Sequence, residues 1–180
     1  LIQFVPLEAE DADGSGDPAQ SGARRANNTG GQTGYGFELE AEWRMTSSLS
    51  LKTYYAWQRS QFDDSNADVP NAPEHQLFAD LRWNFAYDWE LSGQAKWVAG
   101  RMREAGDPRS EIGDYTLTSL VLRRSNIINH MDISLVVNNV FDVEAYEPSP
   151  GEAAIPGGSL VPGDFPLAGR AIYGTIGYQF

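Results

Sequence analysis

Four consecutive segments of the chain alternate apolar and polar residues with a period of two, and one of the two columns that result carries no charge over residues 35–45, 49–57, 77–85 and 89–99. The segments cover residues 33–45, 49–60, 75–85 and 89–101. Charged residues make up 21% of the chain, so 22 positions would hold roughly five of them by chance. The charge-free column holds Tyr35, Phe37, Leu39, Ala41, Trp43, Met45, Leu49, Leu51, Thr53, Tyr55, Trp57, Leu77, Ala79, Leu81, Trp83, Phe85, Trp89, Leu91, Gly93, Ala95, Trp97 and Ala99. The pattern predicts β-strands with one dry and one wet face.

The wet column and three further segments complete the expected sheet. Charged residues of the wet column are Glu38, Glu40, Glu42, Arg44, Lys52, Asp80, Arg82, Glu90 and Lys96. Residues 131–142 continue the alternation, with Ile133 and Leu135 on the dry face, and 168–180 form a closing strand. Residues 114–124 fit less well, and we expect a bulge near Ser119 that leaves Tyr115 and Leu117 on the dry face.

Strand length and aromatic placement favour a membrane barrel over a soluble β-sandwich. The expected strands run to 11 residues or more, long for soluble strands and suited to a tilted membrane crossing. Large aromatic residues stand at both ends of the dry face: Tyr35 and Trp43 are eight residues apart, as are Trp89 and Trp97. That spacing corresponds to about 20 Å along a tilted strand, close to the separation of two aromatic girdles.

The connections alternate in length as in an up-and-down barrel of the outer membrane. Short turns are expected near 46–48, 86–88 and 125–130, and long loops near 6–32, 61–74, 102–112 and 143–167. Such barrels have short periplasmic turns and long outer loops. The sequence therefore predicts an all-β antiparallel barrel segment of about eight up-and-down strands, the first of them represented by residues 1–5.

Composition restricts the possible functions. The formal net charge of −12 argues against nucleic acid as a partner. The chain has no cysteine and no catalytic constellation, so we expect no enzymatic role and no cofactor. His75 and His130 lack partners at metal-ligand spacing, and residues 63–74 lack the glycine that a calcium loop of that length requires.

Several short motifs resemble those of TonB-dependent outer-membrane receptors. Val137-Asn138-Asn139-Val140-Phe141-Asp142 resembles their N-x-F-D strand-end signature, and Gly169-Arg170 with the terminal Phe180 resembles their last strand. Residues 71–75 resemble their strand-opening Pro-x-His, and residues 36–43 their G-x-E-x-E strand. The resemblance covers residues 33–180 and implies that this chain is the last third of a 22-stranded barrel. It also implies an N-terminal plug domain and a TonB box outside the chain.

This resemblance implies import of a scarce ligand, such as a ferric siderophore, across the outer membrane of a Gram-negative bacterium with energy supplied through TonB. The implied partners are outer-membrane lipid, the plug and remaining strands, TonB, the barrel-assembly machinery and an extracellular small-molecule ligand. A self-contained eight-stranded barrel serving as an anchor or adhesin is the alternative. Sugar, cobalamin and other metal chelates stay open as ligands.

Three groups of residues are the candidates for function. The barrel-assembly signal would be Ile172, Ile176, Tyr178 and Phe180. Candidate ligand contacts in the outer loops are Phe62, Asp63, Asp64, Arg101 and Arg103. Side chains expected to face the lumen or the plug are Glu38, Glu40, Glu42, Lys52, Asp80, Arg82 and Lys96. Among these we expect Lys52 to pair with Glu40 or Glu42, and Asp80 or Arg82 to pair with Glu90 or Lys96.

Overall fold

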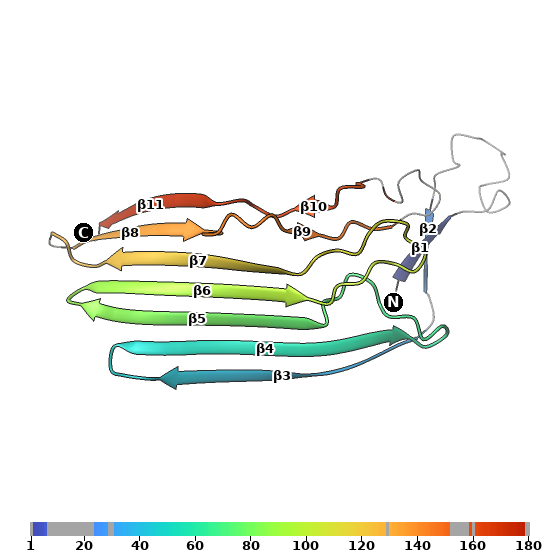
Figure 1. Ribbon diagram of the computed structural model, residues 1–180, viewed down its shortest axis with the longest axis horizontal. Helices are drawn as coiled ribbons and strands as arrows, with labels where there is room; N and C mark the ends of the chain where they lie inside the picture. The colour runs from blue at the N-terminus through green and yellow to red at the C-terminus, as the bar shows by residue number, and fades with distance from the viewer. Residues whose placement is uncertain are drawn as a thin grey trace.

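A single antiparallel sheet of seven strands dominates the computed structural model, which describes residues 2–6, 24–28, 31–128, 130–151, 159 and 161–178. Its order is β11-β8-β7-β6-β5-β4-β3, so every strand pairs with the next sheet strand along the chain (Figure 1). The strands are β3 (Gln32–Arg44), β4 (Leu49–Phe62), β5 (His75–Ala86), β6 (Trp89–Ala99), β7 (Tyr115–Arg124), β8 (Met131–Asn138) and β11 (Ala171–Tyr178). The described ranges contain no helix long and apolar enough to cross a membrane.

The register joins the apolar columns of neighbouring strands into one continuous face. Leu51 of β4 lies opposite Trp43 of β3 on one side and Leu81 of β5 on the other. The same row continues through Gly93, Leu120, Val137 and Ile172 to the far edge of the sheet. This apolar face is confirmed, and its large side chains are exposed in the structure; Trp43, for example, is 63% exposed.

Strand β7 departs from the expected phase. No bulge interrupts its pairing with β6: Gly93 lies opposite Leu120, and Trp97 opposite Thr116. The bulge expected near Ser119 was therefore wrong. Leu120 and Leu122 belong to the apolar face, while Tyr115 and Leu117 belong to the opposite, polar face. The register shift in this part of the sheet lies instead between Asn84 and Ala86 of β5.

The reason for this difference is a loop that covers the polar face near the start of β7. Tyr115 is buried there with Val98 of β6 and Ala145, and Leu117, Val143 and Leu167 pack around them. Val143, Ala145 and Leu167 all come from the connection between β8 and β11. Apolar side chains on the polar face at this end of the sheet are thus buried by the chain itself, rather than by lipid.

Short and long connections lie at opposite ends of the sheet, as expected (Figure 1). The short turns and the end of β11 share one end, which we call the short-turn end. The connections that follow β4, β6 and β8 share the other, the long-loop end. The last of them contains a small ribbon of β9 (Tyr146–Glu147) and β10 (Phe165–Pro166).

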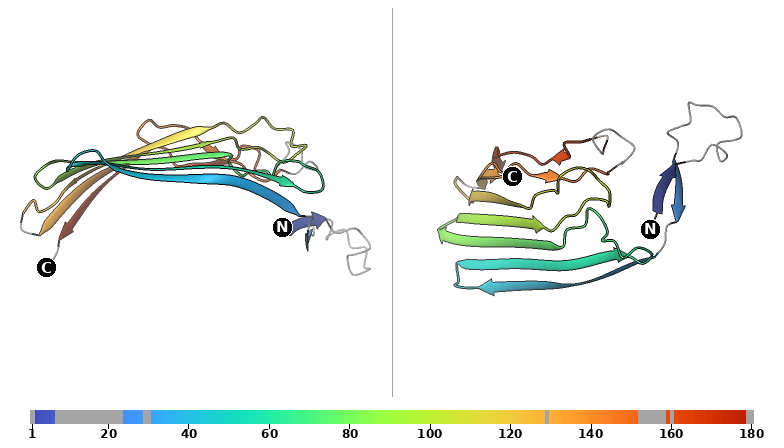
Figure 2. Two further views of the ribbon diagram at one scale, coloured as in Figure 1. Left: turned by 90° about the horizontal axis from the view of Figure 1, so that it is seen from below. Right: turned by 45° about the vertical axis from the view of Figure 1, so that its right-hand side comes forward.

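The first residues do not join the seven-stranded sheet. β1 (Ile2–Pro6) pairs with β2 (Arg24–Asn28) as a separate two-stranded ribbon beyond the long-loop end (Figures 1 and 2). The expected strand at residues 1–5 is present as β1, but residues 24–28, expected to belong to a long loop, form the strand with which it pairs. The backbone of β1 forms its ladder with β2 instead of with β3.

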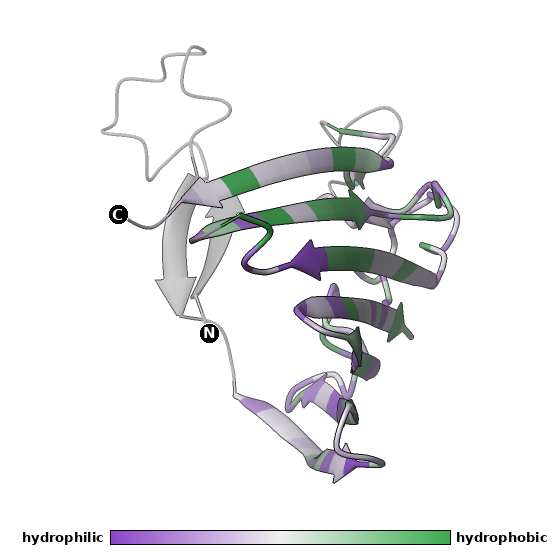
Figure 3. Ribbon diagram, turned by 90° about the vertical axis from the view of Figure 1, so that its left-hand side faces the viewer, coloured by the Kyte–Doolittle hydropathy of each residue, from purple (hydrophilic) through white to green (hydrophobic). Residues whose placement is uncertain are grey.

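The sheet is curved, and aromatic rings gather at both ends of its apolar face. Seen from the short-turn end, the seven strands follow an arc, with β3 and β11 at its edges (Figure 3). At the long-loop end Tyr35, Trp57, Phe37, Tyr55, His75 and Trp97 form a chain of ring contacts with centroids 5.6–6.2 Å apart. Trp83, Phe85 and Trp89 form a second group at the short-turn end.

Candidate functional site

The outer loop after β4 holds three of the predicted ligand contacts. Asp63 accepts a hydrogen bond from Thr33 Oγ1 at 2.7 Å, while Asp64 is exposed. The backbone of Phe62 donates to the carbonyl of Ala67, which closes the loop into a tight turn. Asp68 is held by Arg59 at 3.1 Å. Asp63 and Asp68 thus have different partners and do not point to a common site. In the described ranges, no three side chains of the metal-binding types lie close enough together to hold an ion.

Arg101, another predicted contact, is buried beneath the loops. Its guanidinium donates to the carbonyl of Tyr146 at 2.7 Å, to Glu147 at 3.2 Å and to the carbonyl of Gly113. It also lies 4.7 Å from the centre of the Tyr115 ring. Its side chain is 1% exposed, so its donors face protein and tie the loop after β6 to the connection after β8.

Arg103 is fixed by a second ionic cluster between the same two connections. Its guanidinium holds both oxygens of Asp164, at 2.9 and 2.5 Å, across 61 residues of sequence. Arg109 reaches the same carboxylate at 3.1 Å and Asp107 at 2.6 Å. We call Arg103, Asp107, Arg109, Ser149 and Asp164 the loop latch.

Ser149 completes the loop latch from the connection after β8. Its hydroxyl accepts from Arg109 at 2.6 Å, its amide donates to Asp164 at 3.1 Å and its carbonyl accepts from Arg109 at 3.0 Å. Ser159 lies beside it, with the two hydroxyl oxygens 3.1 Å apart. The side chains of Asp107, Arg109 and Asp164 are each at most a tenth exposed, so the cluster is largely shielded from water.

Charge pairing in the loop latch keeps its carboxylates ionised. The hydrogen bonds from Arg109 lower the pKa of Asp107 to about 2, and Arg103 holds the pKa of Asp164 well below its usual range. In return, Asp164 raises the pKa of Arg103 and Asp107 raises that of Arg109. The latch therefore stays fully charged at neutral pH.

Asp107, Arg109, Ser149 and Asp164 were not predicted from the sequence. The contacts that join the loop after β6 to the connection after β8 cross 40 to 61 residues of sequence, and no spacing rule for a single sequence links such distant positions. A weaker signal is the density of charge in residues 101–109, which hold three arginines, one glutamate and one aspartate.

The two outer loops predicted to contact ligand also touch one another. The amide of Asn71 donates to the carbonyl of Met102 at 2.8 Å, and the amide of Glu74 donates to the carbonyl of Gly100 at 3.2 Å. The loops after β4, β6 and β8 therefore form one connected surface at the long-loop end. Phe62 ends β4, Asp63 and Asp64 open the first of these loops, and Arg101 and Arg103 lie in the second.

The register places the seven predicted lumen-facing residues on one face of the sheet. Lys52 lies opposite Glu42 and Asp80, and its ammonium group is 3.4 Å from Glu40. The expected pairing of Lys52 with Glu40 is confirmed. Glu38, Glu40 and Glu42 share the face with Lys52, Asp80, Arg82 and Lys96.

Asp80 and Arg82 do not form the predicted cross-strand pairs. They pair with each other along β5 at 3.0 Å, instead of with Glu90 or Lys96 of β6. The register explains the difference, since Asp80 lies opposite Gln94 and Arg82 lies opposite Ser92.

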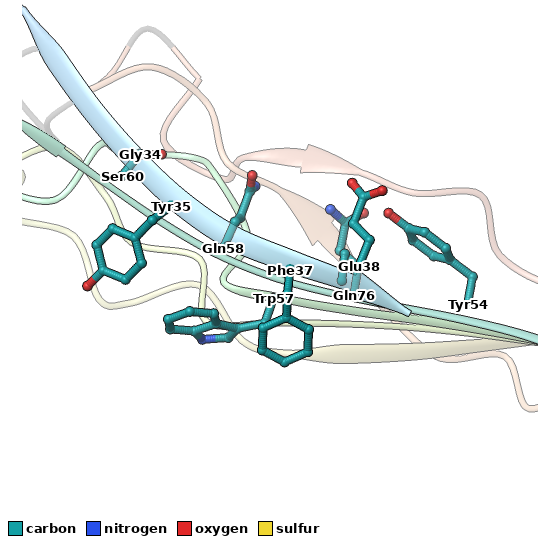
Figure 4. Close-up of a pocket in the computed structure, with 11 residues that line it drawn as sticks. Gly34, Tyr35, Phe37, Glu38, Tyr54, Trp57, Gln58, Ser60 and Gln76 are labelled. Carbon is teal, nitrogen blue, oxygen red and sulfur yellow. The ribbon is translucent and has the colours of Figure 1, made fainter. Parts of the chain in front are cut away.

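A hollow of about 580 Å³ lies beside two glycines of β3 (Figure 4). Glu38, Tyr54, Gln58 and Gln76 point to one side of the ribbon in this view, while Tyr35, Phe37 and Trp57 point to the other. A side chain at Gly36 would come within 2.4 Å of the carbonyl of Trp57, so glycine is required at this position for β3 to approach β4.

The motif residues of the last two strands contact one another. Asn139, at φ 49°, accepts from the amide of Val143 and donates to the carbonyls of Val143 and Ala168. Asp142 accepts from the amide of Arg170 at 2.8 Å. The N-x-F-D signature thus bends the chain at the end of β8 and fixes the approach to β11.

The predicted assembly signal lies on the apolar face of β11 as far as the structure describes it. Ile172, Ile176 and Tyr178 alternate along the strand and are 64%, 74% and 57% exposed. Phe180 lies outside the described residues.

Comparison with known proteins agrees with this geometry. A TonB-dependent receptor-like β-barrel family model matches residues 7–140. Similar solved structures include the copper transporter OprC, with a TM-score of 0.72, 18% identity and coverage of 100% of this chain and 27% of that one. A comparison with curated protein sequences found no match.

Two iron-uptake receptors are also similar in structure. The ferric yersiniabactin uptake receptor FyuA of Yersinia pestis has a TM-score of 0.66 and 23% identity, with 84% of this chain and 24% of that one covered. The ferripyoverdine receptor of the outer membrane of Pseudomonas aeruginosa has a TM-score of 0.65 and 19% identity, with coverage of 97% and 22%. The chain spans about a quarter of the length of these proteins. With most of its residues matched by the family model, the chain belongs to the TonB-dependent receptor-like β-barrel family.

Proposed function

We propose that this chain is the C-terminal portion, residues 1–180, of the barrel of an outer-membrane receptor that imports a scarce ligand such as a ferric siderophore. The observation that carries the proposal is the family match over residues 7–140 on a sheet with one predominantly apolar face. Two of the similar structures are receptors for ferric complexes and one is a copper transporter. TonB would energise import through a plug domain outside this chain.

The short-turn end would face the periplasm and the long-loop end the outside. Long outer loops and short periplasmic turns are the rule in such barrels. The end of β11 lies with the short turns (Figure 1). Ile172, Ile176, Tyr178 and Phe180 would then present the assembly signal on the periplasmic side.

The polar face would line the barrel interior and contact the plug. Glu38, Glu40 and Glu42 concentrate negative charge on β3, and Lys52 compensates it in part through its ion pair with Glu40. A charged, hydrated wall suits contact with a polar domain inside a barrel. The opposite face would contact lipid.

Among the predicted ligand contacts, we assign direct contact to Phe62, Asp63 and Asp64. Arg101 and Arg103 lie in the same connected surface, but their donors are occupied by Tyr146, Glu147 and Asp164. These two arginines would act as positioning residues that hold the loops in place for the ligand.

Growth under iron limitation tests the proposal. A strain that lacks the full gene should grow poorly on the ferric siderophore that the receptor imports, and the intact gene should restore growth. Asp64→Ala should reduce uptake of radiolabelled iron without changing the amount of receptor in the membrane. Equal growth of both strains on every ferric siderophore supplied would contradict iron import. A difference with copper in place of iron would redirect the assignment to a metal of the kind carried by OprC.

A self-contained barrel that serves as an anchor or adhesin is the less supported alternative. In the described ranges β3 and β11 stand at opposite edges of the sheet and do not pair. Such a barrel requires closure, and the seven described strands form an open arc.

A further inference from the structure

An arginine, Arg124, lies on the apolar face near the short-turn end. The corrected register of β7 puts Arg124 opposite Trp89 of β6 and Ile133 of β8, both on the apolar face. Its guanidinium carbon lies 5.2 Å from the centre of the Trp89 ring, and its Nε is buried without a hydrogen-bond partner. Arg123, its neighbour, points to the polar face and pairs with Asp132 at 3.0 Å.

The position of Arg124 is unlike that of the other arginine on this face. Arg59, at the long-loop end of β4, is held by Asp68 at 3.1 Å. Arg124 has no carboxylate partner in the described part of the chain; its recorded contact is the Trp89 ring. Its positive charge is therefore available to an anion at the membrane surface.

A hollow in the apolar face begins at Leu91, two residues along β6 from Trp89, the residue opposite Arg124. It has a volume of about 380 Å³ and is lined by Leu49, Leu81, Trp83, Leu91, Gly93 and Leu120. It exists because Gly93 has no side chain between Leu81 and Leu120, which lie opposite it on the two neighbouring strands. From Leu120 to Arg124 the distance along the strand is about 13 Å at ~3.3 Å per residue.

We propose that these two features form a binding site for one glycerophospholipid of the inner leaflet. Its phosphate would accept hydrogen bonds from Arg124, and one acyl chain would run past Leu122 and Leu91 into the hollow at Gly93. An arginine fork suits a phosphate, and a tryptophan ring beside it is at home at the membrane interface. Because the short-turn end would face the periplasm, the lipid would belong to the inner leaflet of the outer membrane. The proposal rests on the membrane placement proposed above, but not on the ligand that the receptor imports.

Native mass spectrometry of the detergent-purified full-length receptor, titrated with dimyristoyl phosphatidylglycerol, tests the site. One lipid should remain bound to the unaltered protein. Arg124→Gln should weaken the retention of the lipid by about fivefold, the factor expected for one basic side chain at a lipid surface. Gly93→Leu should weaken it by about as much. The leucine at position 93 would fill the hollow, since even its Cβ would come within 3.3 Å of Leu120.

Each of the two positions has a matched control. Arg123→Gln removes an arginine from the opposite face, and Gly174→Leu adds the same side chain at an open position of the apolar face on β11. Both should retain lipid as the unaltered protein does, and all four variants should keep the heat-modifiable migration of a folded barrel. Equal retention by all variants would mean non-specific annular lipid and would overturn the site. So would competition by glycerophosphate, which lacks acyl chains, or stronger retention of lipopolysaccharide, an outer-leaflet lipid.

Discussion

At the scale of single residues, the face that a side chain occupies sets the cost of a charge. Leu81 stands in the middle of the row that crosses the apolar face, between Leu51 and Gly93. Gln94 is next to it in space but on the polar face, opposite the partly unsatisfied carboxylate of Asp80. An arginine should therefore be costly at position 81 and tolerated at position 94.

Leu81→Arg should strongly impair assembly, because an arginine at the middle of the lipid-facing surface costs about 2–4 kcal/mol. Gln94→Arg should assemble normally, since it places the same charge on the wet face near Asp80. The fraction of heat-modifiable receptor in outer-membrane preparations measures both. Equal yields of folded receptor from the two variants would contradict the proposal that the apolar face contacts lipid.

Much of the residue pattern could be predicted because a two-residue period reports the face directly. It failed at Tyr115 and Leu117, where both columns of β7 are apolar. A single sequence does not say whether an apolar side chain is buried by lipid or by a returning loop. Here the loop with Ala145 and Leu167 covers them.

At the scale of elements, the strands were predictable and the contacts between loops were not. β4 begins at Leu49 and β6 at Trp89, at the residues expected. β2, the partner of β1, was missed because residues 24–28, Arg-Arg-Ala-Asn-Asn, carry no alternation of apolar residues. The loop latch was missed because its bonds join residues of two separate connections.

Asp164→Asn should release the loop after β6 from the connection after β8. The carboxylate serves Arg103, Arg109 and Ser149, and loss of one partner from a buried ion pair costs about 3–5 kcal/mol. Protease should then cut these outer loops faster on intact cells, while the sheet stays folded. Asp63→Asn, at a carboxylate with one side-chain partner, is the control. Unchanged cutting in Asp164→Asn would show that the latch does not hold the loops.

Acid should open the latch only at very low pH. The pKa of Asp107 is lowered to about 2 in the folded loop, against about 3.9 in an unfolded chain. Its stabilising contribution is therefore complete above roughly pH 4 and is lost as the pH falls through about 2. Hydrogen exchange of residues 101–114 should show constant protection from neutral pH to about pH 4. Loss of protection near pH 6 would contradict this pairing.

At the scale of the whole molecule, the described sheet has two unpaired edges. β3 and β11 each leave one row of backbone donors and acceptors without a neighbouring strand in the described ranges. Open edges promote pairing with other chains, and a membrane barrel must close because lipid offers no hydrogen bonds. The overall architecture could be predicted from strand and loop lengths, whereas under the proposed function the two edges would pair with the remaining strands of the receptor barrel.

Residues 1–180 refolded in detergent should therefore form mixed oligomers, whereas the full-length receptor should be a single species. Size-exclusion chromatography with light scattering distinguishes the two. A monodisperse monomer of the isolated chain would favour the self-contained barrel over the receptor fragment.

The bend formed by Asn139 and Asp142 has a consequence for how the last two strands find each other. Bringing together β8 and β11 closes a loop of about thirty residues, which costs conformational entropy that rises with the logarithm of loop length. The bonds from Asn139 to Ala168 and from Asp142 to Arg170 hold the two chain segments together at the base of that loop. The β9–β10 ribbon holds them again further out. These contacts divide the long connection into shorter loops, each of which costs less entropy to close. The connection can therefore join β8 to β11 much as a tight hairpin turn would.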